Sequence, residues 1–478
     1  MKKELLLEKA GSQTRLAVME DGRLCEIYYE RGSRTKLAGN IYAGRVQNVL
    51  PGMNAAFVDI GLNKNAFLYA GDILVDTRDD QLLQTRLEGA RIEKLVRPGQ
   101  MILVQVVKEP GGSKGPRVSC SVTLPGRLCV LLPTIEYTGV SKKIDGGGER
   151  KRLLGAASAL AERHGAGIIV RTAAEGTSAE EIEADYLRLM EMWEKIRTAG
   201  SCSAVPRLIQ DDGSLLLRSV RDMLDDSVES LRTDDPSIFE ELNRTAVMLT
   251  PRLAGRIELV ESQTPLFDLY RVDHQLEKAF SRHVYLKSGG TIVVDNTEAM
   301  TVIDVNTGKF TGRKNLRETI FSLNCEAADE IARQLRLRDI GGIVIIDFID
   351  MDSAEDRQAL LDHFREILKN DRNRTNVLGM TALGLVEMTR KKVRRPLTKQ
   401  LMRDCSACLG AGLEWTHESM AYRISREVWR MRRIGEKAPL RIVTGEKVAG
   451  WLGTIGAGEN CIVESTGSDA EFEIHTLI

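Results

Sequence analysis

One strand–helix–strand segment constrains the fold of this 478-residue chain more than any other stretch. Residues 300–306, MTVIDVN, alternate like a strand, and residues 315–340 have the length and periodicity of a helix. The apolar run that begins at Ile343 reads as a second strand and first turns acidic at Asp347. A unit of this length predicts a right-handed crossover between parallel, neighbouring strands.

The two predicted strands carry a candidate metal site. Alternation places Asp304 and Asn306 on one face, and Asp304 and Asp347 near the carboxyl ends of neighbouring strands, where open α/β sheets bind ligands. Two buried carboxylates there would repel each other, and a divalent cation relieves that repulsion. Oxygen ligands favour Mg²⁺ or Mn²⁺, with Asn306 directed at a phosphate or at a water on the metal. The alternative is acids that cap strand ends in solvent, and Asp350 and Asp352 are rival ligands.

Composition indicates a cytoplasmic, multidomain protein. The chain is 42% hydrophobic and 28% charged, with a formal net charge of -1. No apolar run approaches the roughly 20 residues that span a bilayer. A short N-terminal apolar core, interrupted by Glu8 and Lys9, argues against a signal peptide. Residues 387–403 are strongly basic, which fits either a phosphate-binding surface or a solvated helical face.

Residues 39–124 alternate short strands with turns, which predicts a small closed β-barrel. Phe57 and Phe67 lie on its strands, and Lys108 and Lys114 flank a glycine-rich loop. Barrels of the oligonucleotide-binding type stack bases on exposed aromatic rings and hold the backbone with Lys and Arg. The alternative is that both phenylalanines belong to the barrel core.

Two further patterns suggest ligands. Arg171 and Thr172 end an apolar strand, where a guanidinium and a hydroxyl can grip a phosphate; a solvated strand end is the alternative. Cys405 and Cys408, in CSACLGAG, have the spacing of a zinc knuckle, and the context of a redox pair is missing. A closed zinc site needs four ligands, so a second copy of the chain would supply the other two. This predicts a homodimer that shares Zn²⁺.

Together these stretches resemble the bacterial ribonuclease E/G family over most of the chain. The resemblance rests on ordered motifs that include GNIYAGRVQNVLPGMNAAFVDIG, VRTAAEG, LKSGG, DNTEAMTVIDVNTG, GLVEMTRKK and CSACLGAG. GLVEMTRKK is closer to the ribonuclease G branch of the family than to the ribonuclease E branch.

The resemblance implies a multidomain α+β fold. The implied parts are an RNase H-like subdomain split between residues 1–38 and 210–279, an S1 barrel of the OB type inserted at 39–124, a 5′-sensor domain at 125–209, a DNase I-like α/β catalytic subdomain at 280–400, a zinc link at 401–415 and a small C-terminal domain at 416–478.

The activity implied is Mg²⁺-dependent cleavage of single-stranded, A/U-rich RNA to 5′-phosphate and 3′-hydroxyl ends, stimulated by a 5′-monophosphate, in rRNA processing and mRNA decay. Asp304 and Asp347 match the Mg²⁺ ligands, and Asn306 matches the residue that positions the scissile phosphate. Phe57 and Phe67 match the aromatic residues of the RNA channel, and Lys114 matches a basic residue of it. Lys108, beside the glycine-rich loop, and the pair Lys142 and Lys143 complete the predicted RNA-binding residues. The implied 5′-phosphate contacts are Gly126, Val130, Arg171, Thr172 and Arg374.

The chain departs from the family pattern at a few positions. Ser406 stands where the knuckle usually has proline, and Lys142 and Lys143 stand where an arginine pair is common. Lysine cannot form the bidentate fork of arginine, so the role of this pair is open. The resemblance implies a homodimer or a tetramer. Two other classes remain in view: a non-catalytic S1-type RNA scaffold and a zinc-dependent hydrolase.

Overall fold

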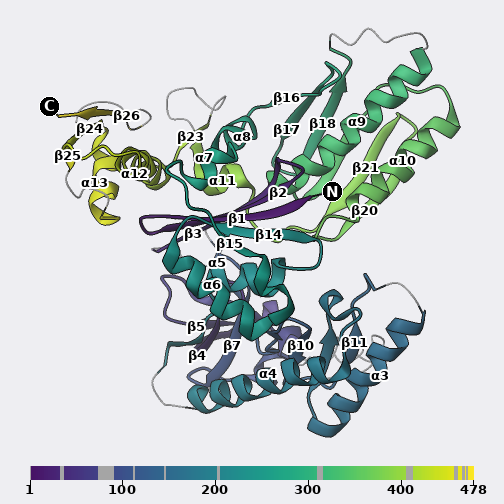
Figure 1. Ribbon diagram of the computed structural model, residues 1–478. Helices are drawn as coiled ribbons and strands as arrows, with labels where there is room; N and C mark the ends of the chain where they lie inside the picture. The colour runs from purple at the N-terminus through teal and green to yellow at the C-terminus, as the bar shows by residue number, and fades with distance from the viewer. Residues whose placement is uncertain are drawn as a thin grey trace. The chain divides into compact units, whose positions relative to one another are not determined.

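The computed structural model describes residues 2–32, 37–73, 91–110, 114–144, 147–201, 205–308, 316–404, 413–456, 461–465, 469 and 472–477. The chain forms two compact units (Figure 1). Unit 1 comprises Met1–Tyr29, Ser227–Glu240 and Arg256–Ile478, and unit 2 comprises Glu30–Asp226 and Glu241–Gly255. Among the described helices, none has the length and apolar character that a membrane crossing requires.

The first sheet of unit 1 combines the N-terminus with strands from far along the chain. Its order is β15-β14-β1-β2-β3, and β1 pairs antiparallel with β2 and parallel with β14. Short helices cover it with an apolar cluster that includes Leu6, Phe267 and Leu276. The elements are β1 (Lys3–Ala10), β2 (Gln13–Glu20), β3 (Arg23–Arg31), β14 (Val228–Thr233), β15 (Ile257–Leu259), α7 (Leu266–Leu269) and α8 (Val272–Lys278). Helix α6 (Pro236–Leu249) begins in unit 1, and most of its residues belong to unit 2.

The second sheet of unit 1 has the order β16-β17-β18-β19-β21-β20. Two helices pack on one of its faces, where Ile303, Val305, Val344 and Ile346 meet apolar side chains of α9 and α10 (Figure 1). The elements are β16 (His283–Tyr285), β17 (Thr291–Asn296), β18 (Met300–Asn306), α9 (Leu316–Leu337), β19 (Gly342–Asp347), α10 (Ala354–Leu368), β20 (Thr375–Met380) and β21 (Leu385–Arg390).

The remainder of unit 1 is a short hairpin and a small helix–sheet domain whose core includes Met420, Ile424, Leu440 and Val448. Its elements are α11 (Leu397–Leu401), β22 (Met402–Asp404), β23 (Leu413–Trp415), α12 (His417–Arg433), β24 (Leu440–Thr444), α13 (Glu446–Thr454), β25 (Cys461–Ser465) and β26 (Phe472–Thr476).

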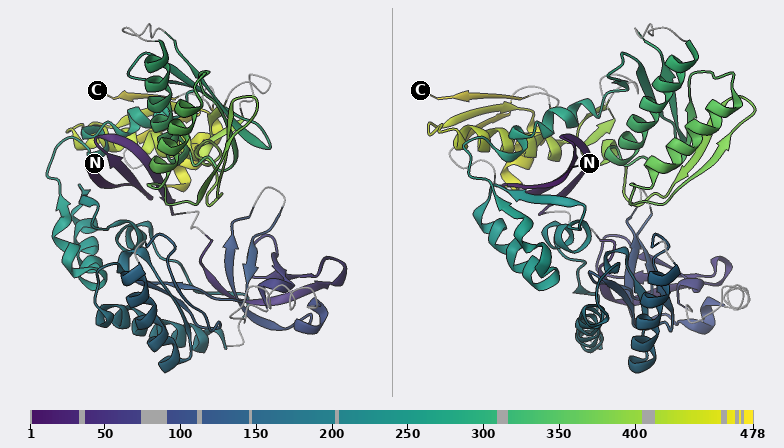
Figure 2. Two further views of the ribbon diagram at one scale, coloured as in Figure 1. Left: turned by 90° about the vertical axis from the view of Figure 1, so that its right-hand side faces the viewer. Right: turned by 45° about the vertical axis from the view of Figure 1, so that its right-hand side comes forward.

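Unit 2 contains the closed five-stranded barrel that the sequence predicts. The strands run in the order β4-β5-β6-β8-β7, β4 also pairs with β7, and β13 adds to β4 (Figure 2, purple and blue). Val58, Leu68, Val104 and Val118 fill the interior. The elements are β4 (Ile41–Leu50), β5 (Ala55–Asp59), β6 (Ala66–Tyr69), α2 (Ile92–Leu95), β7 (Met101–Lys108), β8 (Arg117–Ser119) and β13 (Arg207–Gln210).

Beside the barrel, unit 2 holds a four-stranded sheet of order β11-β12-β10-β9 and two long helices. Ser178 and Glu181 form a capping box that starts α4. The elements are β9 (Leu124–Pro125), β10 (Cys129–Leu132), β11 (Thr138–Val140), α3 (Gly147–His164), β12 (Gly167–Val170), the 3₁₀ turn η3 (Thr172–Ala174), α4 (Ala179–Gly200), α5 (Leu215–Arg218) and the π-helical turn η4 (Ser219–Met223).

Candidate active site

Asp304 and Asp347 lie directly opposite each other on neighbouring parallel strands. The register between β18 and β19 pairs Met300 with Ile343 and ends by pairing Asp304 with Asp347. The parallel, adjacent arrangement expected from the strand–helix–strand pattern is therefore present. Because side chains alternate along both strands, the two carboxylates project from the same face of the sheet.

That face is exposed, which corrects the expectation of buried carboxylates. Along β18, Thr301, Ile303 and Val305 are buried, whereas Asp304 and Asn306 are exposed. Asp347 is also exposed, since the helices α9 and α10 cover the opposite face. The desolvation cost inferred from the sequence is therefore smaller than expected, and solvent or substrate can reach both acids.

Electrostatic repulsion between these acids remains. Partial burial raises the pKa of the Asp347 carboxyl above its usual 3.8, and the negative charges of Asp304 and Asp350 raise it further. Asp350 is thus close enough to act on Asp347, whereas Asp352 is not among the groups that shift it. A bound cation would favour the ionised form of these carboxylates.

The Asn306 side chain contacts Asp304, one of the two candidate metal ligands. Its Nδ2 donates a hydrogen bond of 2.6 Å to Oδ2 of Asp304. The backbone just after β18 packs closely against the turn at Gly289–Gly290. A Cβ on Gly308 would lie 2.4 Å from the Gly289 carbonyl oxygen, so a larger residue could not approach this turn as closely. Gly308 also has a φ of +56°, which favours glycine. The glycines of LKSGG and of NTG therefore fix the backbone that carries Asn306.

Asn324 on α9 positions the segment after β19, and sequence analysis did not identify it. Its fully buried amide donates to the carbonyl of Ile349 at 2.8 Å and accepts from the Ile349 N–H at 3.1 Å. These two bonds hold the backbone between Asp347 and Asp350. No local motif marks Asn324, because its partner lies 25 residues further along the chain.

The donor set fits Mg²⁺ that is held mainly by water and substrate. Within the part of the chain that the structure describes, no cluster of three or more His, Cys, Asp or Glu side chains is arranged to hold a metal. Asp304 and Asp347 supply two carboxylates, and Mg²⁺ commonly binds one or two carboxylates together with water and phosphate. The residues present therefore suit Mg²⁺ better than an ion that needs an all-protein cage.

In the barrel, Phe57 and Phe67 form a cross-strand pair on the outer side. Their ring centroids are 6.0 Å apart at an interplanar angle of 71°. Both rings are half-buried, while the alternate residues Val58 and Leu68 point into the core. This geometry disfavours the core alternative and leaves a partly exposed aromatic surface.

Basic side chains accompany this aromatic surface. Lys108 and Lys114 are both exposed. In the strand register, Lys108 of β7 lies opposite Arg117 of β8, and Arg117 lies opposite Phe67 of β6. Cations therefore lie on strands that adjoin the aromatic pair, an arrangement suited to the backbone of a single-stranded nucleic acid.

Arg171 and Thr172 lie where β12 ends and η3 begins. The Arg171 guanidinium donates to the carbonyl of Gly126 and forms an ion pair of 2.8 Å with Asp222. The Thr172 hydroxyl is 2.9 Å from the hydroxyl of Ser141. The sequence did not reveal Asp222 or Ser141, because both come from distant parts of the chain and have no local motif.

Three other predicted phosphate or RNA contacts lie near this point. Val130, on β10, is half-buried and lies opposite Ile169 of β12, two residues before Arg171. Lys142 and Lys143 are exposed in the turn that follows β11. Arg150 braces that turn with hydrogen bonds to the backbone carbonyls of residues 140 and 141 at 3.1 and 2.8 Å.

The remaining predicted residues are Arg374 and the cysteine pair. Arg374 is exposed just before β20 and belongs to unit 1, whereas Arg171 belongs to unit 2. Cys405 and Cys408 lie outside the described residues. The strands that flank them, β22 and β23, pair so that Asp404 is opposite Leu413.

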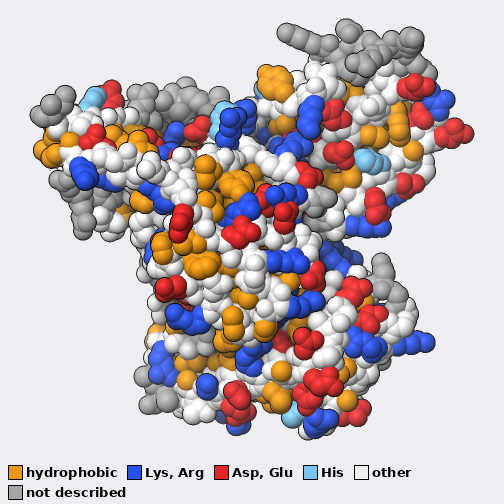
Figure 3. Space-filling view, viewed as in Figure 1, with side chains coloured by type: hydrophobic (Ala, Val, Ile, Leu, Met, Phe, Trp, Pro, Cys, Tyr) orange, Lys and Arg blue, Asp and Glu red, His pale blue; other side chains and the backbone are white. Residues whose placement is uncertain are grey.

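The charge distribution agrees with the near-neutral composition. On the face shown in Figure 3, acidic and basic side chains are interspersed over both units. Attraction of a polyanion would then depend on local groups such as Lys108, Lys114, Lys142 and Lys143, because a uniformly basic surface does not cover this face.

Comparisons with known proteins agree on one family. The sequence model of the Ribonuclease E/G family matches residues 123–393. Ribonuclease G of Salmonella typhimurium is 42% identical over 435 residues, covering 90% of this chain and 88% of that protein. Ribonuclease G of Haemophilus influenzae is 41% identical over 94% of this chain and 91% of its own length. Ribonuclease E of the same organism is 36% identical over 89% of this chain and 45% of its own. The chain belongs to the ribonuclease E/G family.

Proposed function

We propose that this protein is an endoribonuclease that hydrolyses single-stranded RNA with Mg²⁺ held by Asp304 and Asp347. The observation that carries the proposal is the direct pairing of two exposed carboxylates, Asp304 and Asp347, across parallel strands. Relatives named ribonuclease G, aligned over about nine-tenths of the chain, support the same reaction class.

The reaction proposed is attack of water on a phosphodiester, which leaves a 5′-phosphate and a 3′-hydroxyl. When bound, Mg²⁺ would supply positive charge for the developing phosphate charge and lower the pKa of water; Mn²⁺ has similar ligand preferences. Asp304 and Asp347 would hold the ion, and Asn306, whose amide donates to Asp304, would contact the scissile phosphate. The Gly289 and Gly308 backbone keeps that amide in place.

The substrate proposed is single-stranded RNA, with a preference for A/U-rich sequence that rests on the family resemblance. Phe57 and Phe67 would stack on unpaired bases, and Lys108 and Lys114 would contact the backbone. Lys142 and Lys143 would add positive charge in the turn that follows β11, close to Thr172 in the proposed 5′-end site. A duplex would expose few base faces to the aromatic pair.

The 5′ end of the substrate is proposed to bind at Arg171 and Thr172, with the backbone of Gly126 and Val130 and with Arg374. The adjacent residues Arg171 and Thr172, at the end of β12, supply a guanidinium, which contacts Gly126, and a hydroxyl, which contacts Ser141. A 5′-monophosphate would add charge-assisted hydrogen bonds there that a 5′-hydroxyl cannot make. We therefore expect cleavage to be faster on monophosphorylated RNA.

The domain layout and assembly are likewise proposals. The sheet that joins residues 3–31 to 228–259 supports an RNase H-like subdomain split by the barrel and the sensor domain. Cys405 and Cys408 would bind Zn²⁺ together with the same residues of a second chain, giving a homodimer or a tetramer. A cytoplasmic role in rRNA processing and mRNA decay fits this activity.

A cleavage assay with a short A/U-rich single strand tests the function. Wild type should cut with Mg²⁺ and not with EDTA, and Asp304→Asn or Asp347→Asn should lose cleavage by at least about a hundredfold while still binding RNA. Asp329→Asn, which alters an exposed acid on helix α9, is the matched control and should cut like wild type. Binding without any cleavage by wild type would favour the RNA-scaffold alternative.

A further inference from the structure

The guanidinium of Arg171 is held from two sides. One terminal nitrogen donates to the Gly126 carbonyl, and the other forms the 2.8 Å ion pair with Asp222. The Arg171 and Asp222 side chains are 27% and 26% exposed, so the pair lies at the edge of the surface. A guanidinium has five N–H donors, and these two contacts leave donors for a phosphate.

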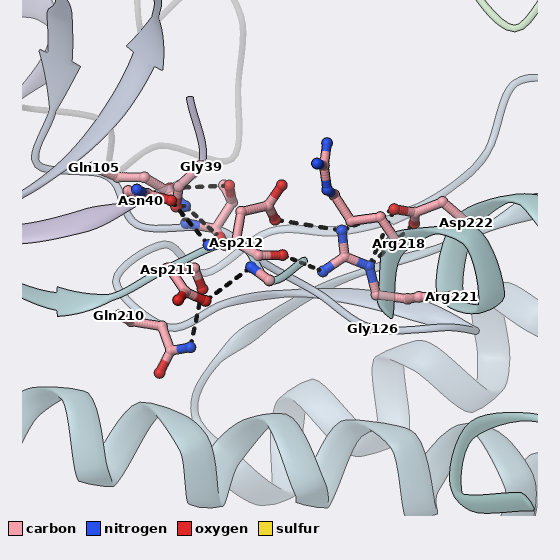
Figure 4. A network of polar contacts seen from close by, with 12 residues as sticks. Gly39, Asn40, Gln105, Gly126, Gln210, Asp211, Asp212, Arg218, Arg221 and Asp222 are labelled. Carbon is pink, nitrogen blue, oxygen red and sulfur yellow. Dashed lines mark hydrogen bonds and ion pairs between the residues drawn. The ribbon is translucent and has the colours of Figure 1, made fainter. Parts of the chain in front are cut away.

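Asp222 is itself fixed by Arg221 (Figure 4). The largely buried Arg221 guanidinium approaches Asp222 with its Nε at 3.1 and 3.2 Å and with a terminal nitrogen at 2.8 Å. Burial by itself would raise the pKa of Asp222, but the hydrogen bond and charge of Arg221 and the charge of Arg171 outweigh it and lower the pKa. The lowered pKa favours the ionised form of Asp222, and the contacts with Arg221 hold the carboxylate in addition to its ion pair with Arg171.

The same contacts continue to the barrel. Arg221 also pairs with Asp212 at 3.3 Å, and the Asp212 N–H donates to Oδ1 of Asn40 at 2.9 Å. The Asn40 carbonyl accepts from the Val106 N–H of β7 at 2.9 Å. Figure 4 shows Asp222, Arg221, Asp212 and Asn40 in one continuous line of polar contacts.

Close packing makes the barrel end of this line rigid. A Cβ on Gly39 would lie 2.7 Å from the side chain of Asp212, so only glycine fits beside it. Gln105 of β7 donates to the carbonyls of Gly39 and Thr123 at 2.9 Å each. At the other end, Arg127 donates to the Arg221 carbonyl at 3.2 Å and joins the turn η4 to the connection between β9 and β10.

We infer that Asp222, anchored by Arg221, is a positioning residue that aims the Arg171 guanidinium at the 5′-phosphate and fixes its place relative to the barrel. The inference rests on the proposed 5′-end recognition and names the residues that give it geometry. The Asp222 charge is shared between two guanidinium groups, so Arg171 keeps net positive charge for an anion. Without Asp222, the Arg171 guanidinium would keep only its hydrogen bond to the Gly126 carbonyl out of these two contacts, and its side chain could then adopt several rotamers.

A masking role is the opposite hypothesis. If Asp222 competed with the phosphate for Arg171, removing the carboxylate would free the guanidinium and strengthen recognition of a 5′-monophosphate. Positioning and masking thus predict effects of opposite sign. The sign is measurable as the ratio of kcat/KM for 5′-monophosphorylated RNA to kcat/KM for the same RNA with a 5′-hydroxyl.

The test measures this ratio in full-length wild type, Asp222→Ala and Asp222→Asn. Positioning predicts that KM for the monophosphorylated RNA rises about tenfold in Asp222→Ala, the value of one charge-assisted hydrogen bond, with kcat little changed. The ratio then falls toward one, and less far in Asp222→Asn, which keeps the side-chain volume and one acceptor. Asp226→Asn is the matched control, because Asp226 is exposed and pairs with exposed Arg252 at 2.9 Å.

The outcomes separate the inference from the proposed function. A wild-type ratio of one would overturn 5′-end recognition and the inference with it. A wild-type ratio well above one that persists in both Asp222 variants, or increases, would overturn the inference alone. If Asp222→Ala loses cleavage of both RNAs, then Asp222→Asn decides, with circular dichroism and binding of the monophosphorylated RNA in EDTA as checks of folding.

Discussion

Asp304 and Asp347 owe their proximity to backbone register. The parallel ladder of β18 and β19 places the two carboxylates opposite each other, and a shift by one residue would turn one of them to the helix-covered face. Asn306 adds an amide whose direction is set by Asp304. At the scale of the residue, the site is therefore two charges and one oriented donor.

Removing the Asn306 amide should slow the chemical step more than it weakens binding. We expect Asn306→Ala to lower kcat by about a hundredfold, because a donor aimed at developing phosphate charge contributes mainly in the transition state. KM for RNA should change little. Asn296→Ala, which alters an exposed asparagine on the neighbouring strand β17, is the control. A wild-type kcat in Asn306→Ala would remove this residue from the mechanism.

The proposed stacking of RNA bases on Phe57 and Phe67 of the barrel can be tested separately from cleavage. Phe57→Ala or Phe67→Ala should weaken binding of a single-stranded RNA by about tenfold, since one base–aromatic stack is worth roughly 1–3 kcal/mol. Phe57→Tyr keeps a ring and should bind like wild type. Fluorescence anisotropy in EDTA measures the affinity without cleavage. Equal affinities for all the variants would return both rings to a purely structural role.

The sequence predicted the residues that a local motif marks and missed their partners. Asp304, Asn306 and Arg171 stand out because a polar residue interrupts or ends an apolar strand. Asp222 and Asn324 do not stand out, because their contacts join segments far apart in the chain. No periodicity or spacing encodes such a pairing.

At the scale of elements, a buried ionic cluster joins α9 to the first sheet. Arg336 of α9 pairs with Glu26 of β3 at 2.7 Å and with Glu20 of β2 at 2.6 Å, and the Tyr28 hydroxyl donates to Glu26 at 2.6 Å. Burial by itself would raise the pKa of Glu26. The charges of Arg372 and Arg336 and the Tyr28 hydrogen bond outweigh burial and lower it from its usual 4.5 to about 2.

The depressed pKa gives this cluster a defined pH dependence. The stabilisation from ionised Glu26 is present above pH 4.5 and is lost as the pH falls toward about 2, because the unfolded chain takes up the proton first. Glu26→Gln should lower the free energy of unfolding at neutral pH by about 3–5 kcal/mol, as one partner of a buried pair is lost. The gap between variant and wild type should narrow below pH 4.5.

Thermal unfolding at neutral pH and at acid pH checks this prediction. Glu229→Gln is the matched control, because Glu229 is 55% exposed and pairs with exposed Lys2 at 3.4 Å. It should unfold like wild type at both pH values. A Glu26→Gln midpoint equal to that of wild type at neutral pH would contradict the account of the cluster.

Elements with strong local patterns were predicted, and their long-range pairing was not. The barrel and the strand–helix–strand unit follow from alternation, turns and helical periodicity. Local patterns do not predict the parallel pairing of β1 with β14, because most of unit 2 separates them in the sequence, and only the family resemblance placed these two segments in one subdomain. The exposed face of β18 was also missed, since alternation does not say which face the helices cover.

At the scale of the whole molecule, the zinc link makes a prediction about assembly. If Cys405 and Cys408 share Zn²⁺ with a second chain, Cys405→Ser or a zinc chelator should convert oligomers to monomers. Light scattering after size-exclusion chromatography measures the mass, and Cys461→Ser is the control, because Cys461 lies in a different sheet. An oligomer that survives complete removal of zinc would contradict the shared site.

The central claim is that water attacks the phosphodiester at the Asp304–Asp347 site. The most direct measurement is cleavage of a single-stranded RNA with Mg²⁺ in water enriched in heavy oxygen, followed by mass spectrometry of the products. The account predicts one heavy oxygen in the new 5′-phosphate, an unlabelled 3′-hydroxyl on the other fragment, and no product from Asp304→Asn. A 2′,3′-cyclic phosphate, an unlabelled 5′-hydroxyl fragment, or undiminished cutting by Asp304→Asn would contradict it.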